Sequence, residues 1–114
     1  MRFAPKIALP RATRKNEIWV TDFSILDDSQ RTKILIVLDV FTRLPVVLAI
    51  LDSKAEIATQ LVTHLTEAGR GLRYPEMLWV DAGLEVGSEK LTEWAGQRVI
   101  ILYRKRNAAE TQHR

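Results

Sequence analysis

The sequence contains no cysteine and no long apolar run. Without cysteine, disulfides and thiolate metal sites are excluded, and a reducing compartment is permitted. The longest uninterrupted apolar stretches, residues 34–38 and 46–51, are far too short to cross a bilayer, and residues 1–10 lack a continuous apolar segment of the signal-peptide kind. These absences predict a cytoplasmic protein with no membrane partner.

Acidic residues are missing from the first 16 positions, although the net charge of the whole chain is only +3. Residues 1–16 carry five cations and two prolines with no apolar period, so we interpret them as a basic N-terminal arm. Residues 98–114 carry five further Arg and Lys residues against a single acid. Basic ends around a near-neutral middle suit a polyanion such as nucleic acid; solvated tails are the alternative.

The chain has the size of one domain, at 114 residues, and 46% of its residues are apolar. Those values are ordinary for a globular protein with a single core. We therefore expect one folded unit over residues 17–114.

Three β-rich segments open this unit. Residues 17–25 alternate, residues 33–40 are apolar on both faces as in a central strand, and residues 45–52 form a third strand that begins with a permitted proline. The connections between them are short, which indicates an antiparallel meander.

The period then changes to that of helices. Ser53 and Glu56 form a capping box, and apolar residues recur at helical spacing until Gly69. A strand over 76–81, a helix capped by Ser88, a strand over 98–103 and a short last helix follow. The predicted order is β-β-β-α-β-α-β-α: an α/β fold with three antiparallel strands, then parallel strands with helical crossovers, and a truncated last helix.

Two aspartates stand out against this pattern. Asp22 shares the alternation of Ile18 and Val20 inside a strand, where a carboxylate is unfavourable; an early turn or a salt bridge to an Arg are the alternative interpretations. Asp81 follows Val80 at a strand end, where functional groups of α/β sheets gather. If the two strands are adjacent, two carboxylates converge, and a divalent cation held by oxygens relieves their repulsion.

Several motifs around these aspartates occur in a specific order. They are W-x-x-D-F at Trp19, D-x-F-T-R at Asp39 and D-x-G-x-E at Asp81. In this order, over Glu17 to Glu110, the sequence resembles the catalytic core of the DDE superfamily, which comprises retroviral-type integrases and bacterial insertion-sequence transposases and has a ribonuclease H-like fold.

The resemblance implies a function and a site. Asp22, Asp81 and Glu110 would be the catalytic and metal-binding residues, holding two Mg²⁺ or Mn²⁺ ions for hydrolysis and strand transfer at DNA phosphodiesters. It further implies DNA integration or transposition, DNA as partner, a homodimer or higher homo-oligomer, and a bacterial, nucleoid-associated location. A hydrolytic nuclease would use the same carboxylates.

The sequence also departs from the family pattern. Ala82 replaces the usual Asn, and Glu110 follows Asn107 by three residues rather than four, a rotation of about 100° on a helix. Only 28 residues separate Asp81 from Glu110. The alternative function is therefore a non-catalytic remnant that serves DNA binding or self-association.

Other prominent residues have structural interpretations. Asp39 and Arg43 are expected to pair across or cap the turn between the second and third strands, and Glu85 to satisfy backbone donors. The three tryptophans are expected in packing roles.

Overall fold

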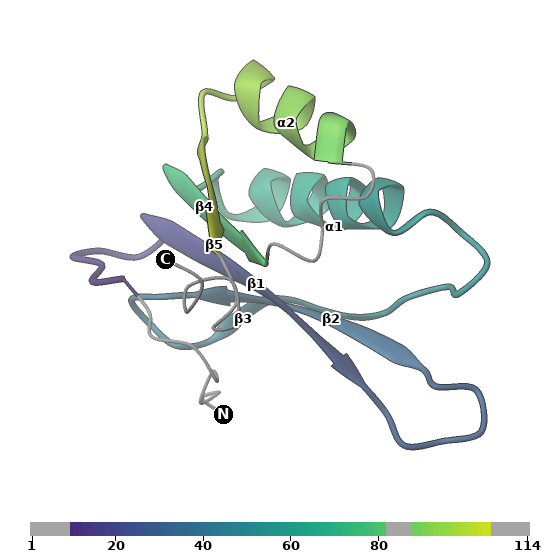
Figure 1. Ribbon diagram of the computed structural model, residues 1–114. Helices are drawn as coiled ribbons and strands as arrows, with labels where there is room; N and C mark the ends of the chain where they lie inside the picture. Colours follow the sequence, from purple (N-terminus) through teal and green to yellow (C-terminus); the bar gives the residue numbers. More distant parts are fainter. Residues whose placement is uncertain (1–9, 82–87, 106–114) are drawn as a thin grey trace, which may run out of the picture.

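The computed structural model describes residues 10–81 and 88–105, with the backbone alone at residues 81, 88 and 105. A five-stranded sheet of order β3-β2-β1-β4-β5 organises the chain (Figure 1). The elements in chain order are β1 (Ile18–Ile25), β2 (Lys33–Asp39), β3 (Pro45–Ile50), α1 (Ile57–Gly71), β4 (Met77–Asp81), α2 (Ser88–Gln97) and β5 (Ile101–Lys105).

The strand directions match the predicted topology. β1 pairs with β2 and β2 with β3 in antiparallel fashion, whereas β1 with β4 and β4 with β5 are parallel. Parallel neighbours need crossover connections, and the helices α1 and α2 occupy those two connections. The sequence-based fold class is therefore confirmed. The predicted last helix lies outside the described residues.

The main core lies between the sheet and the helices, which both cover the same face (Figure 1). Alternate strand residues, among them Trp19, Leu35 and Leu78, are fully buried there against Leu65 of α1 and Leu91 of α2. The period of two along each strand puts these residues on one side of the sheet. We call this side the helix face.

The opposite side of the sheet, which we call the open face, also carries apolar residues. Ile18, Val20, Leu38 and Val40 form a second buried cluster, against which Ala12 of the N-terminal arm packs. Within the described ranges, no helix covers this face. Residues 33–40, which are apolar on both sides, were expected to form a central strand, and β2 lies inside the sheet between β3 and β1.

The start of α1 differs from the sequence-based prediction. The helix begins at Ile57, and Glu56, which precedes it, has an extended backbone and makes no side-chain cap. Gln60 fastens this segment instead: its Oε1 accepts the Asp52 amide at 2.7 Å and its Nε2 donates to the Asp52 carbonyl at 2.9 Å. The predicted Ser53 capping box is wrong, because a side chain one turn inside the helix orders the preceding loop.

Gly69 does not end α1, which continues to Gly71. The aromatic ring of Tyr74 fills the space that a Cβ at Gly69 would occupy. Tyr74 is held there because its hydroxyl donates to the Thr66 carbonyl at 3.2 Å and its ring contacts Trp94 edge-on at a centroid distance of 5.8 Å. Glycine at this position serves close packing between helix and loop rather than helix termination.

The last described strand also begins later than expected. Val99 has a positive φ of 56° and is exposed, so the strand starts at Ile101 rather than at Arg98. Ile100 closes the end of α2, since its amide donates to the Ala95 carbonyl at 2.9 Å. A search of the described helices finds none that is long and apolar enough to span a membrane.

The contact between Gly69 and Tyr74 yields a stability prediction. Gly69→Ala should lower the free energy of unfolding by about 1–3 kcal/mol, because the new methyl group overlaps the ring, although Ala normally favours a helix. Gly96→Ala is the matched control: it lies inside α2 with open space around it, and it should raise stability by up to about 1 kcal/mol. Urea unfolding measures both, and equal stabilisation by the two variants would contradict the packing role.

Candidate functional site

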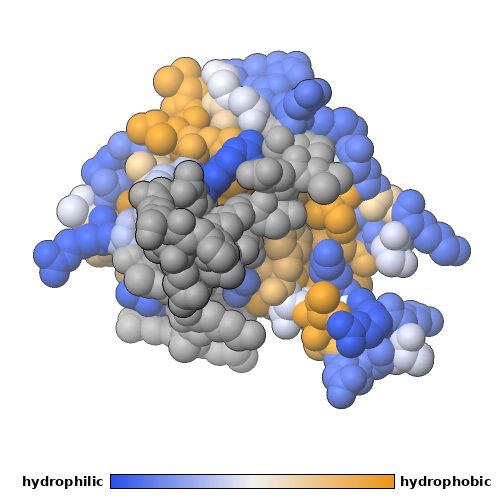
Figure 2. Space-filling view, in the orientation of Figure 1, coloured by the Kyte–Doolittle hydropathy of each residue, from blue (hydrophilic) through white to orange (hydrophobic). Residues whose placement is uncertain are grey.

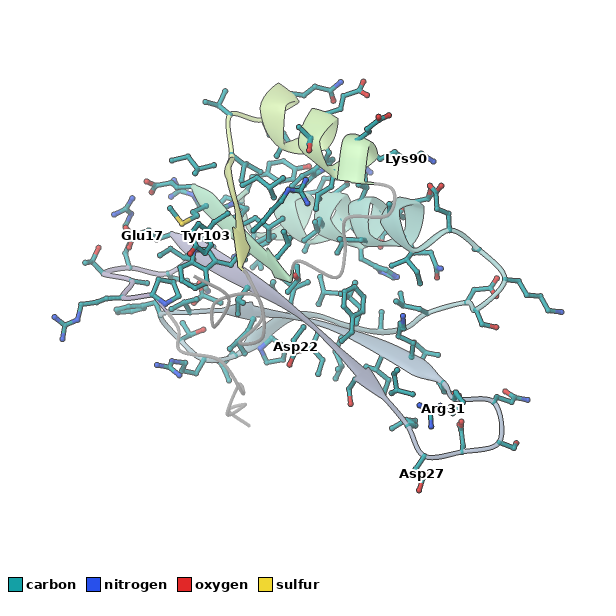
Figure 3. The ribbon with its side chains drawn as sticks, viewed as in Figure 1. Glu17, Asp22, Asp27, Arg31, Lys90 and Tyr103 are labelled. Carbon is teal, nitrogen blue, oxygen red and sulfur yellow. The ribbon has the colours of Figure 1, made fainter. Side chains whose placement is uncertain are left out.

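Asp22 lies inside β1, opposite Ile36 of β2. Its side chain is exposed and projects on the open face, away from α1 and α2 (Figure 3). The strand continues to Ile25, so the turn that could have begun at Asp22 is absent. No hydrogen bond or ion pair from Asp22 to another described residue is found, which also sets aside the salt bridge to an Arg. Asp22 is a solvated strand carboxylate, and its register partner on β2, Ile36, is apolar.

Asp81 is the last residue of β4, the parallel neighbour of β1. The pairing register joins Ile18 to Met77 and Val20 to Trp79. The same spacing, continued by two residues, brings Asp22 level with Asp81 on the adjacent strand. The predicted adjacency of the two strands is therefore confirmed.

One residue before Asp22, a side chain of β1 forms a hydrogen bond to the backbone of β4. The Thr21 hydroxyl donates to the Trp79 carbonyl at 3.1 Å, and Thr21 is buried. The register of the two strands is thus held by a hydrogen bond from the residue that precedes Asp22. The two aspartates stand where this pairing ends, at the carboxyl end of β4.

On the other side of β4, the backbone partner of Asp81 is Lys105 of β5. Sequence reasoning missed this neighbour, because it ended the last strand at Tyr103 and gave no register between β4 and β5. Lys105, a potential cation on a third strand, therefore lies level with the two aspartates.

The remaining predicted site residue, Glu110, lies outside the described residues, as do Ala82 and Glu85. Over the ranges that the structure does describe, no group of three His, Cys, Asp or Glu residues comes together to hold a metal ion. Oxygen ligands from two adjacent strands suit one Mg²⁺ that keeps water on its other positions. Asp22 fits such a role, since it is exposed and engaged with no described residue.

Aromatic residues border this level on the open face. Trp79 and Tyr103 are register partners, two positions before Asp81 and Lys105, and their ring centroids lie 4.4 Å apart. Trp79 also donates from Nε1 to the Met77 sulfur at 2.9 Å. The sheet surface beside Asp22 is thus largely apolar, and low-polarity walls strengthen the attraction between carboxylates and a cation.

Asp39 is a second aspartate of the sheet, with a structural function. It is 1% exposed, and its two oxygens accept the backbone amides of Asn16 and Thr42, each at 2.9 Å. It pairs with Trp19, three residues before Asp22 on β1. The expected capping of the β2–β3 turn by Asp39 is confirmed, and the same carboxylate also fixes the end of the N-terminal arm.

In the described part of the arm, Arg14 is engaged in ion pairs within the fold. Arg14 forms ion pairs with Glu17 and Glu76, and the amide of Thr13 donates to Glu17 at 2.7 Å. The hydrogen bonds from Thr13, its amide foremost, and the charge of Arg14 lower the pKa of Glu17. Arg14 is therefore occupied by protein carboxylates at the amino-terminal end of β4, opposite the end that carries Asp81.

Comparison with known proteins identifies the fold. No family model and no curated protein sequence matches this chain. A chain of the simian T-cell lymphotropic virus intasome, solved in complex with PP2A regulatory subunit B56 gamma, matches with a TM-score of 0.69 and 17% identity over 90% of this chain. This chain spans only 39% of the length of that one.

Two integrase catalytic core domains match similarly. That of HTLV-2, solved with magnesium in a dimeric form, has a TM-score of 0.65 and 16% identity, covering 89% of this chain and 68% of that chain. That of BIV has a TM-score of 0.65 and 12% identity, covering 79% and 55%. The protein therefore has the ribonuclease H-like fold of retroviral integrase catalytic cores, as the sequence motifs indicated.

The position of Asp39 yields a second stability prediction. Asp39→Ala should destabilise the fold by about 2–5 kcal/mol, because two buried amides lose their charged acceptor. Asp27→Ala, in the exposed β1–β2 turn, removes the same group and should change stability by less than about 0.5 kcal/mol. Chemical denaturation compares the two, and equal effects would show that Asp39 does not fasten the arm and the turn.

Proposed function

We propose that this chain is the catalytic core of a metal-dependent DNA-processing enzyme of the integrase or transposase type. The most direct support is that Asp22 and Asp81 lie level with each other on neighbouring parallel strands. This position, at the carboxyl end of β4, borders the region where α/β sheets bind their ligands. The fold shared with integrase catalytic cores supports the same reaction class.

In this proposal, Asp22 and Asp81 supply carboxylate oxygens to one divalent ion, and Glu110 completes the site. With Glu110, these carboxylates would hold divalent ions, and such ions would supply activation of the attacking hydroxyl and charge stabilisation of the leaving oxygen at a phosphodiester. The residues themselves need form no covalent intermediate. The backbone of Asp22 is held in β1 by pairing with Ile36 of β2.

DNA is the proposed substrate and partner, and the uneven charge of the chain supports it. Lys105 is the last residue of β5, the strand that borders β4, and the basic arm precedes β1. Cations near a metal site attract and position phosphates without selecting a base sequence. We propose one catalytic unit over residues 17–114, preceded by a basic arm, in a protein of the bacterial cytoplasm.

A non-catalytic remnant is the second candidate, and one observation favours it specifically. Lys105 is the register partner of Asp81, so a lysine charge can offset the carboxylates in place of a metal ion. Ala82 in place of the usual Asn, and the shorter spacing of Glu110 from Asn107, also favour this second candidate. Such a chain would keep the fold and DNA binding but lose the reaction.

Metal binding separates the two candidates. A metal ion that binds only the folded state raises the melting temperature, by the equivalent of about 1.4 kcal/mol at ten times the Kd. We expect Mg²⁺ or Mn²⁺ to stabilise the natural chain. The double variant Asp22→Asn with Asp81→Asn should melt higher in metal-free buffer, because the repulsion is relieved, and should not respond to metal.

The control for this titration is Asp27→Asn, which removes one carboxylate from the exposed β1–β2 turn (Figure 3). Its metal response should equal that of the natural chain. An unchanged response in the double variant would refute the site, and no response in any chain would favour the remnant.

Cleavage of DNA tests the complete site. We expect the 114-residue chain to perform no strand transfer and at most trace Mn²⁺-dependent nicking, because Glu110 follows Asn107 by three residues instead of the usual four, which on a helix is a rotation of about 100°. Nicking should disappear in Asp22→Asn and persist in Asp27→Asn. Strong Mg²⁺-dependent cleavage that is lost in Glu110→Gln would show instead that Glu110 completes a competent site.

A further inference from the structure

Val99 closes α2 in a backbone conformation that is unfavourable for its side chain. The Val99 amide donates to the Gly96 carbonyl at 3.2 Å, and the Ile100 amide donates to the Ala95 carbonyl at 2.9 Å, which is the hydrogen-bond pattern of a Schellman motif. The residue with positive φ in this motif is usually glycine, because a β-branched side chain is strained there. Val99 has a φ of 56°, so the chain carries strain that glycine would avoid.

Packing does not offset this strain. The Val99 side chain is 88% exposed, which is the highest exposed fraction among the large hydrophobic residues of the described chain. Ile100, by contrast, is buried in the main core together with Ala95. Stability therefore gives a reason for isoleucine at position 100 and none for valine at position 99. A residue that is strained in the folded state without a gain in packing indicates a role in binding.

The segment that carries Val99 lies beside the loop between α1 and β4. The Arg98 guanidinium stacks over the ring of Tyr74, and the Ile101 amide donates to the Glu76 carbonyl at 2.9 Å. The two segments are therefore held next to each other at both ends. They lie at the amino-terminal end of β4 and β5, opposite the end that carries the candidate metal site (Figure 1).

Further apolar side chains are exposed on these two segments. Ile101 is 61% exposed, and Leu72, the residue that follows α1, is exposed as well. Figure 2 shows hydrophobic atoms gathered over the start of β5, and Ile101 is the first residue of that strand. Exposed apolar side chains that are grouped in this way are typical of a protein-binding surface, whereas single ones are not.

Two cations accompany these apolar side chains. Arg70 and Arg73 are exposed, and neither side chain has a hydrogen bond or ion pair with another described residue. The carboxylates of Glu17 and Glu76, at the start of β1 and β4, are already engaged by Arg14. The two arginines therefore keep their charge available for a partner that carries carboxylates. We use the name Val99 surface for Leu72, Val99, Ile101, Arg70 and Arg73.

The centre of the Val99 surface is held rigidly. The Arg98 guanidinium lies 5.1 Å from the ring centroid of Tyr74 and 4.9 Å from that of Trp94, and its Nη1 donates to the Trp94 carbonyl at 3.2 Å. The two hydrogen bonds of the Schellman motif fix the backbone of the next residue, Val99. A partner would therefore bind a preformed surface, which keeps the entropic cost of binding low.

We propose that the Val99 surface binds an acidic, apolar segment of another protein. Apolar side chains of that segment cover Val99 and its apolar neighbours, and its carboxylates pair with Arg70 and Arg73. An apolar centre with a charged rim is the usual arrangement of a protein interface. Nucleic acid is a less suitable partner, because a phosphate backbone offers Val99 no apolar contact. The surface lies at the opposite end of β4 from Asp81, so its role is independent of the metal site.

Peptides selected on the full 114-residue chain from a random phage-displayed library test the proposal. The selected sequences should combine Asp or Glu with Leu, Ile or Phe, and fluorescence anisotropy measures the Kd of the strongest binder. Val99→Gly should bind that peptide about tenfold more weakly. The same variant should melt at a higher temperature than the natural chain, because glycine adopts the positive φ without strain. Weaker binding by a more stable variant cannot result from a folding defect.

Two control variants test whether the effect belongs to this surface. Arg73→Glu should weaken peptide binding, whereas Arg31→Glu, in the exposed β1–β2 turn, should leave the Kd unchanged (Figure 3). Leu48→Thr, which removes an exposed apolar side chain from β3 at the other edge of the sheet, should also leave it unchanged.

Selection of no acidic peptide, or equal binding by Val99→Gly and the natural chain, would overturn the proposal. Duplex DNA and self-association are measured on the same variants. If either of these falls by the same factor in Val99→Gly, the surface belongs to nucleic acid or to a second copy of the chain, and the proposed protein partner is wrong.

Discussion

The parallel pairing of β1 with β4 is the constraint on which the rest of the structure depends. It forces the chain between β3 and β4 to cross over the sheet, which places α1 on one face. It also ends at the level where Asp22 and Asp81 stand on neighbouring strands. The start of β1 is fixed by Asn16, whose Oδ1 accepts the indole N–H of the fully buried Trp19 at 3.0 Å, and whose amide donates to Asp39. The candidate site is therefore positioned by a buried polar network at the other end of its strand.

The sequence predicts the order of the elements because hydrophobic periodicity is a local property. The alternation of Ile18, Val20 and Asp22 also correctly placed Asp22 on a defined face of a strand. The ends of α1 could not be predicted, since they depend on side-chain contacts of Gln60 and Tyr74 with residues eight positions away, beyond the span of a capping motif. Local signals such as Ser53 or Gly69 mark helix ends only where no tertiary contact competes with them.

Strand register limits what sequence can say about the site. Adjacency of β1 and β4 follows from the recognised fold, but the neighbour of Asp81 on β5 depends on where that strand starts. Val99 sets that start: its positive φ closes α2 and delays β5 to Ile101. The strand consequently continues to Lys105, which becomes the partner of Asp81. A backbone feature at the end of a helix thus decides whether a lysine stands beside the candidate metal ligand.

Folding alone gives no reason for Asp22. A strand aspartate has an unfavourable propensity, and this one gains no described partner that would offset it, whereas Asp39 gains one buried and one partly buried hydrogen bond. Its exposure keeps the cost small, because the carboxylate remains solvated, so the fold tolerates it without requiring a metal.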